Sequence, residues 1–297
     1  MYENHFGLRE PPFGLTPDTS YFFSCAPAQE ALNTLLVATR SGEGFIKITG
    51  EVGTGKTLLC RNFLAALGHE FIAAYVPNPY LDPDALLQTL ADDFRIERNP
   101  GTDRHHLLKL ITHTLLDFAR AGKRVIVCLD EAQAMPLQTL EALRLLTNLE
   151  TEKRKLLQVV LFGQPELDQK LQDPCVRQLR QRISFQYRLR SFQAGETEDY
   201  LRHRLNVAGY ARGELFTWPA ARMIHGFAGG VPRLVNILAH KSLLLAFGRG
   251  DLRVRVADVY RAAADTPAAA RGVLRRAIPV IAALAVSVGG VGWALLA

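Results

Sequence analysis

Eight residues from Gly50 to Thr57 read G-E-V-G-T-G-K-T and have the spacing of a phosphate-binding loop. Its glycines let successive backbone N–H groups turn towards phosphate oxygens, and the helix that follows adds positive potential. We expect Lys56 to reach the β and γ phosphates of ATP and Thr57 to ligate Mg²⁺. The expected nucleotide contacts are Gly50, Glu51, Val52, Gly53, Thr54, Gly55, Lys56, Thr57 and Leu58.

An acidic pair, Asp130 and Glu131, follows the apolar run at 125–129. Adjacent carboxylates at the end of a buried strand have separate tasks in phosphoryl transfer. Asp130 would hold the magnesium ion through water, and Glu131 would polarise the attacking water. The pair therefore predicts hydrolysis of ATP as well as binding.

Two further polar residues are candidates for work near the γ phosphate. Gln164 follows the apolar run that ends in Phe162-Gly163, and it would either orient the water or cap the next turn. Arg233 follows Gly229-Gly-Val-Pro, and proline at helix position N1 puts it in the first turn of a helix. From there Arg233 would reach the γ phosphate or form a structural ion pair.

Five arginines crowd one short stretch at the end of the same region. They are Arg177, Arg180, Arg182, Arg188 and Arg190. Arginine suits planar contact with phosphate. Arg182, with Arg180 as the alternative, would act as an arginine finger on a neighbouring subunit's nucleotide, an effect worth about 10³ to 10⁵ in rate. A solvated basic helix or a DNA-facing patch would also explain the cluster.

These residues need a scaffold that brings strand ends together, and the hydrophobic pattern predicts one. Apolar, β-branched runs occur at 45–49, 71–76, 125–129 and 156–162. Helical patterns separate them, and after residue 192 the pattern is helical with glycine breaks. This alternation predicts an α/β fold, a P-loop core whose parallel sheet has helices on both faces and ligand at the carboxyl ends of its strands.

The chain is therefore expected to comprise five segments. These are an N-terminal lead-in at 1–40, an αβα nucleotide-binding core at 41–190, a small helical domain at 191–265, a basic linker at 266–276 and a transmembrane helix at 277–297.

The last segment, AIPVIAALAVSVGGVGWALLA, has no charged residue and no polar face. At about 1.5 Å per residue its helix would be about 31 Å long, which matches the hydrocarbon layer of a bilayer. Arg271, Arg275 and Arg276 precede it and no basic residue follows, so the positive-inside rule puts the ATPase domain in the cytoplasm. We expect a single-pass protein of the bacterial inner membrane with a periplasmic C-terminus; a buried C-terminal helix is the alternative.

The composition argues against several classes of protein. A hydrophobic content of 48% is enough for a buried core and argues against overall disorder. The four cysteines include no C-x-x-C pair, so neither a zinc site nor a disulfide framework is indicated. The N-terminus lacks the apolar run of a signal peptide. A net charge of +6 is compatible with nucleic acid or anionic lipid but is common among soluble proteins.

Taken in order, the motifs resemble those of the AAA+ ATPases of secretion and type IV pilus biogenesis, the family of general secretion pathway protein A and the MSHA-type pilus ATPases, and most closely the latter. They are MYENHFGLREPPFGLTPDTSYFF, SGEGFIKITGEVGTGKT, VCLDEAQ, LFGQPEL, LRQRI and GGVPRLVN. The resemblance covers residues 1 to about 265. It implies an AAA+ core with a helical lid, Gln164 in the sensor 1 region, Arg182 at the finger position and Arg233 at sensor 2. Gln164 departs from the usual Asn or Thr.

The expected function is that of a membrane-anchored AAA+ ATPase that supports assembly of a type IV pilus or a type II-like secretion complex. Its expected partners are further copies of itself in a nucleotide-dependent oligomer such as a ring, inner-membrane assembly proteins and membrane lipid, without nucleic acid. Two alternatives remain: a DNA-associated AAA+ regulator of the transposition target-selection type, and a nucleotide-dependent scaffold with little turnover.

Overall fold

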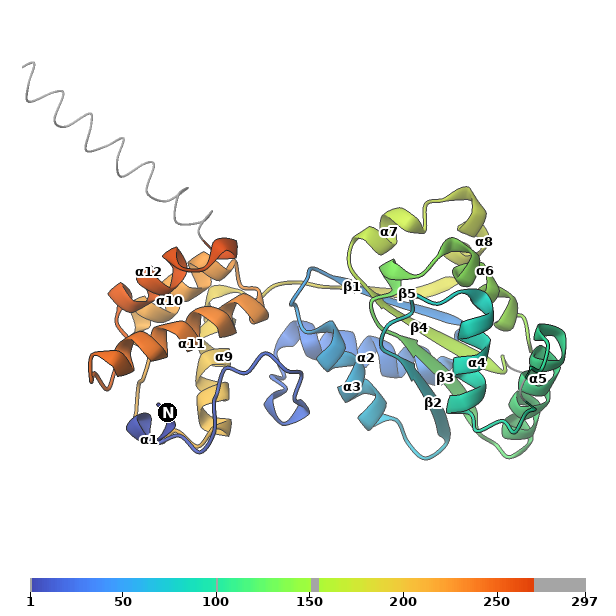
Figure 1. Ribbon diagram of the computed structural model, residues 1–297, viewed down its shortest axis with the longest axis horizontal. Helices are drawn as coiled ribbons and strands as arrows, with labels where there is room; N and C mark the ends of the chain where they lie inside the picture. Colours follow the sequence, from blue (N-terminus) through green and yellow to red (C-terminus); the bar gives the residue numbers. More distant parts are fainter. Residues whose placement is uncertain (1, 100, 151–154, 270–297) are drawn as a thin grey trace, which may run out of the picture. The chain divides into compact units, whose positions relative to one another are not determined.

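The computed structural model describes residues 2–99, 101–150 and 155–269, which form two compact units (Figure 1). One unit runs from Ser24 to Arg190, and the other joins the N-terminal residues up to Phe23 to the chain from Ser191 onwards. The transmembrane helix expected at 277–297 lies outside the described residues, as does most of the linker before it. No helix within the described ranges is long and apolar enough to cross a membrane.

The first unit is built on a five-stranded parallel sheet in the order β2-β3-β4-β1-β5. Its strands are β1 (Phe45–Gly50), β2 (Phe71–Val76), β3 (Arg124–Leu129), β4 (Leu157–Gly163) and β5 (Ile183–Leu189). The central strand β4 is buried along its whole length, as parallel strands covered on both faces are. The four expected strands and the parallel sheet are confirmed, and β5 is an additional edge strand.

Helices cover both faces of this sheet (Figure 1). They are α2 (Ala26–Ser41), α3 (Lys56–Ala66), α4 (Pro83–Asp93), α5 (Arg104–Arg120), α6 (Leu137–Leu146), α7 (Glu166–Lys170) and α8 (Arg177–Gln181). Alternate residues of a strand face opposite sides, so Val125 and Val127 of β3 join the core beneath α4, α5 and α6. Ile126 and Cys128 are equally buried but are not part of that core. On the other face, α2 and α3 contact β1.

Aspartate caps explain where two of these helices begin. The carboxylates of Asp82 and Asp103 accept hydrogen bonds from the backbone N–H groups of Ala85 and His106, at 2.7 and 2.9 Å. Each bond satisfies one of the donors that the first turn of a helix leaves unpaired.

The second unit is a bundle of four helices with the N-terminal segment packed on it. The helices are α9 (Ala194–Val207), α10 (Trp218–Ala228), α11 (Pro232–Gly248) and α12 (Val256–Ala264), and the segment carries the short α1 (Glu3–Phe6). Apolar side chains of the segment, such as Phe6 and Phe13, belong to the core of the bundle. The lead-in expected as one piece at 1–40 is thus divided between the two units.

Polar contacts fix the N-terminal segment along the bundle. The backbone N–H of Arg9 donates to the carbonyl of Ala208 at 2.8 Å. The buried guanidinium of Arg204 donates to the carbonyl of Pro12 and lies 4.4 Å from the ring centre of Tyr21. Because Arg204 is on α9, the segment is held to the bundle by backbone and side-chain contacts as well as by apolar packing.

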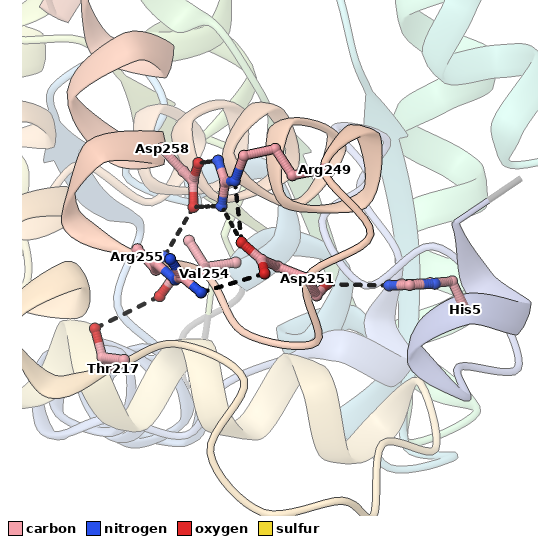
Figure 2. Close-up of polar contacts among 7 residues, drawn as sticks. All are labelled: His5, Thr217, Arg249, Asp251, Val254, Arg255 and Asp258. Atoms are coloured by element: carbon pink, nitrogen blue, oxygen red, sulfur yellow. Dashed lines mark hydrogen bonds and ion pairs between the residues drawn. The ribbon is translucent and has the colours of Figure 1, made fainter.

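An ion-pair cluster closes the loop between α11 and α12 (Figure 2), and we call it the α11–α12 staple. Arg249 donates to both carboxylate oxygens of Asp258, which is fully buried, and to Asp251. Asp258 also accepts the backbone N–H of Arg255 at 2.8 Å, and the Arg255 side chain pairs with Asp251. His5 of the N-terminal segment contacts the carbonyl of Asp251 at 3.0 Å. The loop therefore has a fixed conformation.

Two adjacent glycines before α11 allow a matched test of how closely the backbone at Gly230 approaches that of Phe192. Gly230 has φ +71°, and a Cβ there would lie 2.0 Å from the Phe192 carbonyl oxygen, whereas Gly229 has φ +58° with open space around it. Gly229→Ala should lower the free energy of unfolding by about 1 to 2 kcal/mol, because alanine must adopt a left-handed conformation there. Gly230→Ala should cost about 1 to 3 kcal/mol more, because the backbone must move. Urea unfolding followed by circular dichroism measures both, and equal losses would contradict the close approach.

Candidate nucleotide-binding site

The phosphate-binding loop connects β1 to α3 and depends on its glycines. Gly53 and Gly55 have φ values of 80° and 96°, in the left-handed region that favours glycine. At Gly50 a Cβ would lie 2.8 Å from the Thr54 hydroxyl oxygen and 2.9 Å from the Leu189 carbonyl oxygen. Glycines at these positions therefore allow the loop to close tightly on itself.

Lys56 is the first residue of α3, and its side chain is almost wholly buried. Its Nζ donates to the carbonyl oxygens of Gly50 at 2.8 Å and Glu51 at 3.0 Å. Burial lowers the pKa of Lys56, whereas the nearby carboxylates of Glu131 and Asp130 favour its charged form. An ammonium group has three donors, so this one retains a proton for an anionic ligand.

Asp130 follows β3 directly and is buried beside Thr57. Burial raises the pKa of Asp130, while hydrogen bonds from the Thr57 side chain and the backbone N–H of Glu131 oppose the shift. The bond from Glu131 is 3.0 Å long. A hydroxyl next to a carboxylate is a donor set that suits Mg²⁺, which takes few protein ligands and completes its shell with water and phosphate oxygens. These two residues fit the expected ion.

Glu131 lies in a hydrogen-bonded network with two amide side chains, Gln133 and Gln164, which we call the carboxylate–amide network. One oxygen of Glu131, Oε2, accepts from the Nε2 of Gln133 and from the Nε2 of Gln164, the latter at 2.9 Å. The Oε1 of Gln133 in turn accepts the backbone N–H of Gln164 at 3.0 Å. The other oxygen of Glu131 accepts no hydrogen bond from the described residues.

The backbone positions the members of this network. Thr49 of β1 is in register with Gly163 of β4, so Gln164 follows beside the start of the phosphate-binding loop. Glu131 has φ 53° and ψ 37°, a left-handed conformation that is uncommon for a side chain other than glycine and is frequent at functional sites. Lys170 of α7 donates to the carbonyls of Gln133 and Met135 and holds the short turn between them.

Gln133 was not among the residues predicted from the sequence. Its only signal is its position two residues after Glu131 in the run D-E-A-Q, and nothing in that spacing specifies which way the side chain turns. The 3₁₀ turn at Ala132–Ala134 is what brings the amide back to the carboxylate.

The arginines of the cluster have different surroundings. Arg182 follows α8 directly, is half-buried and donates to the Thr147 hydroxyl over 3.4 Å. Arg180 is exposed, and its side chain has no hydrogen bond or ion pair with the described residues. Arg188 of β5 lies 3.7 Å from Glu51 of the phosphate-binding loop, a contact that the sequence analysis did not predict. Of Arg180, Arg182 and Arg188, it is therefore Arg188 that lies beside the phosphate-binding loop.

Arg233 is the second residue of α11 and belongs to the helical unit. Its side chain is exposed and forms no ion pair within the part of the chain that the structure describes. The structural ion pair considered as the alternative is therefore not seen among those residues, and contact with the γ phosphate stays a prediction.

Comparisons with known proteins agree with this architecture. Residues 39–171 match a protein family described as an AAA domain. Over 263 residues, 89% of the chain, the sequence is 43% identical to General secretion pathway protein A of Aeromonas hydrophila. The chain spans about half of that protein, 48% of its length.

Two solved structures are similar in fold. Cdc6p from Pyrobaculum aerophilum matches with a TM-score of 0.63 and 19% identity, over 84% of this chain and 70% of that one. The ORC2 protein of Aeropyrum pernix, in its ADPNP–ADP complexes, matches with a TM-score of 0.57 and 17% identity, over 83% and 71% of the two chains. At these identities the likeness shows the fold alone.

The family resemblance predicted from the motifs is thus confirmed by a relative that aligns with most of the chain. The chain carries an AAA domain with the P-loop fold and is similar, over most of its length, to General secretion pathway protein A.

Proposed function

We propose that this protein binds and hydrolyses ATP with Mg²⁺ and uses nucleotide-dependent self-association to support assembly of a secretion or type IV pilus complex at the inner membrane. The observation that carries the enzymatic part is the convergence of the buried Lys56 ammonium, the Thr57–Asp130 pair and the oriented Glu131 carboxylate around one loop. The relative's printed name supports the link to secretion.

In the proposed reaction each residue has a separate task. Lys56 and the backbone N–H groups of the loop bind the β and γ phosphates, and Thr57 and Asp130 hold the magnesium ion, which supplies charge neutralisation. Among the described residues Glu131 accepts hydrogen bonds at one oxygen, and its other oxygen would polarise the attacking water. Gln164 and Gln133 keep the carboxylate turned in one direction, and this makes Gln133 a positioning residue.

The membrane anchor of this proposal rests on the sequence. The chargeless segment at 277–297 and the three arginines before it support a single-pass topology with the ATPase domain in the cytoplasm.

Replacement of Glu131 tests whether ATP binding and ATP hydrolysis depend on different residues. Glu131→Gln should keep ATP binding and lower the rate of phosphate release about 10² to 10⁴-fold, because it removes the group that takes the water's proton. Lys56→Ala is the companion variant and should lose ATP binding, measured with a fluorescent ATP analogue. Turnover that survives Glu131→Gln would refute the assignment, and an equally slow wild-type protein would favour the scaffold alternative.

Gln133 should affect catalysis without affecting affinity. Gln133→Ala leaves Glu131 with one amide donor and removes the side-chain oxygen that accepts the backbone N–H of Gln164. We therefore expect kcat to fall about ten-fold or more, as it does when a positioned group is misplaced. The KM for ATP should change little. Gln138→Ala, an exposed glutamine on α6, is the matched control and should behave as wild type. A rise in KM with unchanged kcat would show that Gln133 acts on nucleotide binding instead.

An arginine finger supplied by a neighbouring subunit makes activity depend on assembly. Specific activity should rise with protein concentration, and Arg182→Ala should lower it about 10³-fold or more while ATP binding is retained. Mixing Arg182→Ala with Glu131→Gln should restore activity, because each protein supplies what the other lacks. Arg180→Ala tests the alternative finger, and Arg177→Ala is the exposed control on the same helix. Activity that is independent of concentration, with no recovery on mixing, would exclude a shared site.

A further inference from the structure

The helical unit has an exposed apolar face at its C-terminal end. Val256 and Tyr260 are 37% and 49% exposed, and their spacing of four residues puts them on one side of α12. Ala264, four residues further on, is also exposed. Leu252, in the loop that leads into the helix, is 58% exposed. We call Leu252, Val256, Tyr260 and Ala264 the α12 face.

Contacts with the rest of the helical unit fix the position of the α12 face. The α11–α12 staple fixes the loop on both sides of Leu252, since Asp251 and Arg255 are both members of it (Figure 2). The ring of Tyr260 packs edge-on against Phe227 of α10, with 6.4 Å between ring centres. The exposed side chains therefore belong to an ordered surface.

Unpaired positive charge accompanies the apolar side chains. Asp251 and Asp258 are paired with arginines, and Asp265 pairs with Lys241 at 2.8 Å. Arg253 and Arg261 are exposed, and no ion pair among the described residues involves them. From residue 249 to 276 the sequence contains seven arginines and three aspartates as its charged residues, a net charge of +4. The charge that remains unneutralised is therefore positive.

The chain leads from this face directly towards the segment expected to span the membrane. The described part of the chain ends at Ala269, and the apolar segment begins at Ala277. Eight residue-to-residue steps cover about 29 Å at most when fully extended. An anchor at 277–297 would thus keep α12 close to the cytoplasmic leaflet, whose lipids are anionic.

We propose that the α12 face, with Arg253 and Arg261, docks on the surface of an anionic bilayer. Aromatic rings with a polar end and arginines with long apolar stems are the side chains that suit the interface between headgroups and acyl chains. The docked face would set the orientation of the helical unit at the membrane. This proposal rests on the membrane anchoring proposed above.

The test uses the full chain reconstituted in vesicles. Cys175, the exposed cysteine among the four, is replaced by serine, and Val256→Cys is labelled with an environment-sensitive fluorophore. Val37→Cys on α2, 58% exposed, is the matched control site on the other unit. The vesicles are of phosphatidylcholine, with or without phosphatidylglycerol, and contain lipids that carry a nitroxide quencher. Unchanged thermal unfolding of the labelled variants confirms that they fold.

We expect the label at 256 to shift to shorter wavelength and to be quenched in the anionic vesicles, and the label at 37 to remain aqueous. Each basic side chain near an anionic surface contributes a factor of about five in affinity. The pair of changes Arg253→Gln and Arg261→Gln should therefore lower the ratio of docked to undocked label about twenty-five-fold, with little effect in neutral vesicles.

Three outcomes would overturn the proposal, and they can be told apart. In the first, the protein floats with the vesicles and resists alkaline extraction, but its label at 256 stays aqueous. The anchor is then present and the docking face is not. Protein that does not float with the vesicles refutes the anchor and the docking together. A label at 256 that responds to duplex DNA and not to vesicles assigns the basic face to nucleic acid.

Discussion

The ammonium group of Lys56 is the charge on which the arrangement of the nucleotide-binding unit depends. A buried cation is costly unless polar groups surround it, and here two backbone carbonyls and two nearby carboxylates do so. The carbonyls belong to the last residue of β1 and the residue after it, and the carboxylates follow β3. Because β4 lies between these two strands, the parallel sheet is the element that brings the groups to one edge. The same edge receives Gln164 from β4.

Orientation of the Glu131 carboxylate depends on a second constraint, the unusual backbone conformation at that residue. The left-handed conformation of Glu131 leads directly into the 3₁₀ turn, which brings the Gln133 amide to the carboxylate. The two hydrogen bonds to one oxygen of Glu131 orient the carboxylate before any ligand arrives. Preorganisation of this kind is where electrostatic contributions to catalysis originate, since the groups need not reorganise during the reaction.

The parts of the site that were predicted from the sequence are those that local spacing determines. The phosphate-binding loop and the acidic pair each consist of residues that are neighbours in the chain. Both motifs, and the strands that precede them, could therefore be predicted from the sequence. Strand β5 was missed because Arg188 on it and the arginines around it favoured a basic patch, although its alternation of apolar and polar residues is a strand pattern. The contact of Arg188 with Glu51 arises only from the pairing of β5 with β1. Gln133 was missed because its role depends on the direction of a side chain in a turn.

The division of the chain between the two units has a consequence for its synthesis. Residues 2–23 find their apolar partners only after Ser191, so the whole nucleotide-binding unit emerges from the ribosome between the two halves of the helical unit. At about 5 to 20 residues per second this interval lasts on the order of ten seconds or more. During that time Phe6, Phe13 and the other aromatic side chains of the segment have no bundle to pack against. The apolar side chains of the N-terminal segment therefore stay without their core until the second half of their unit is made.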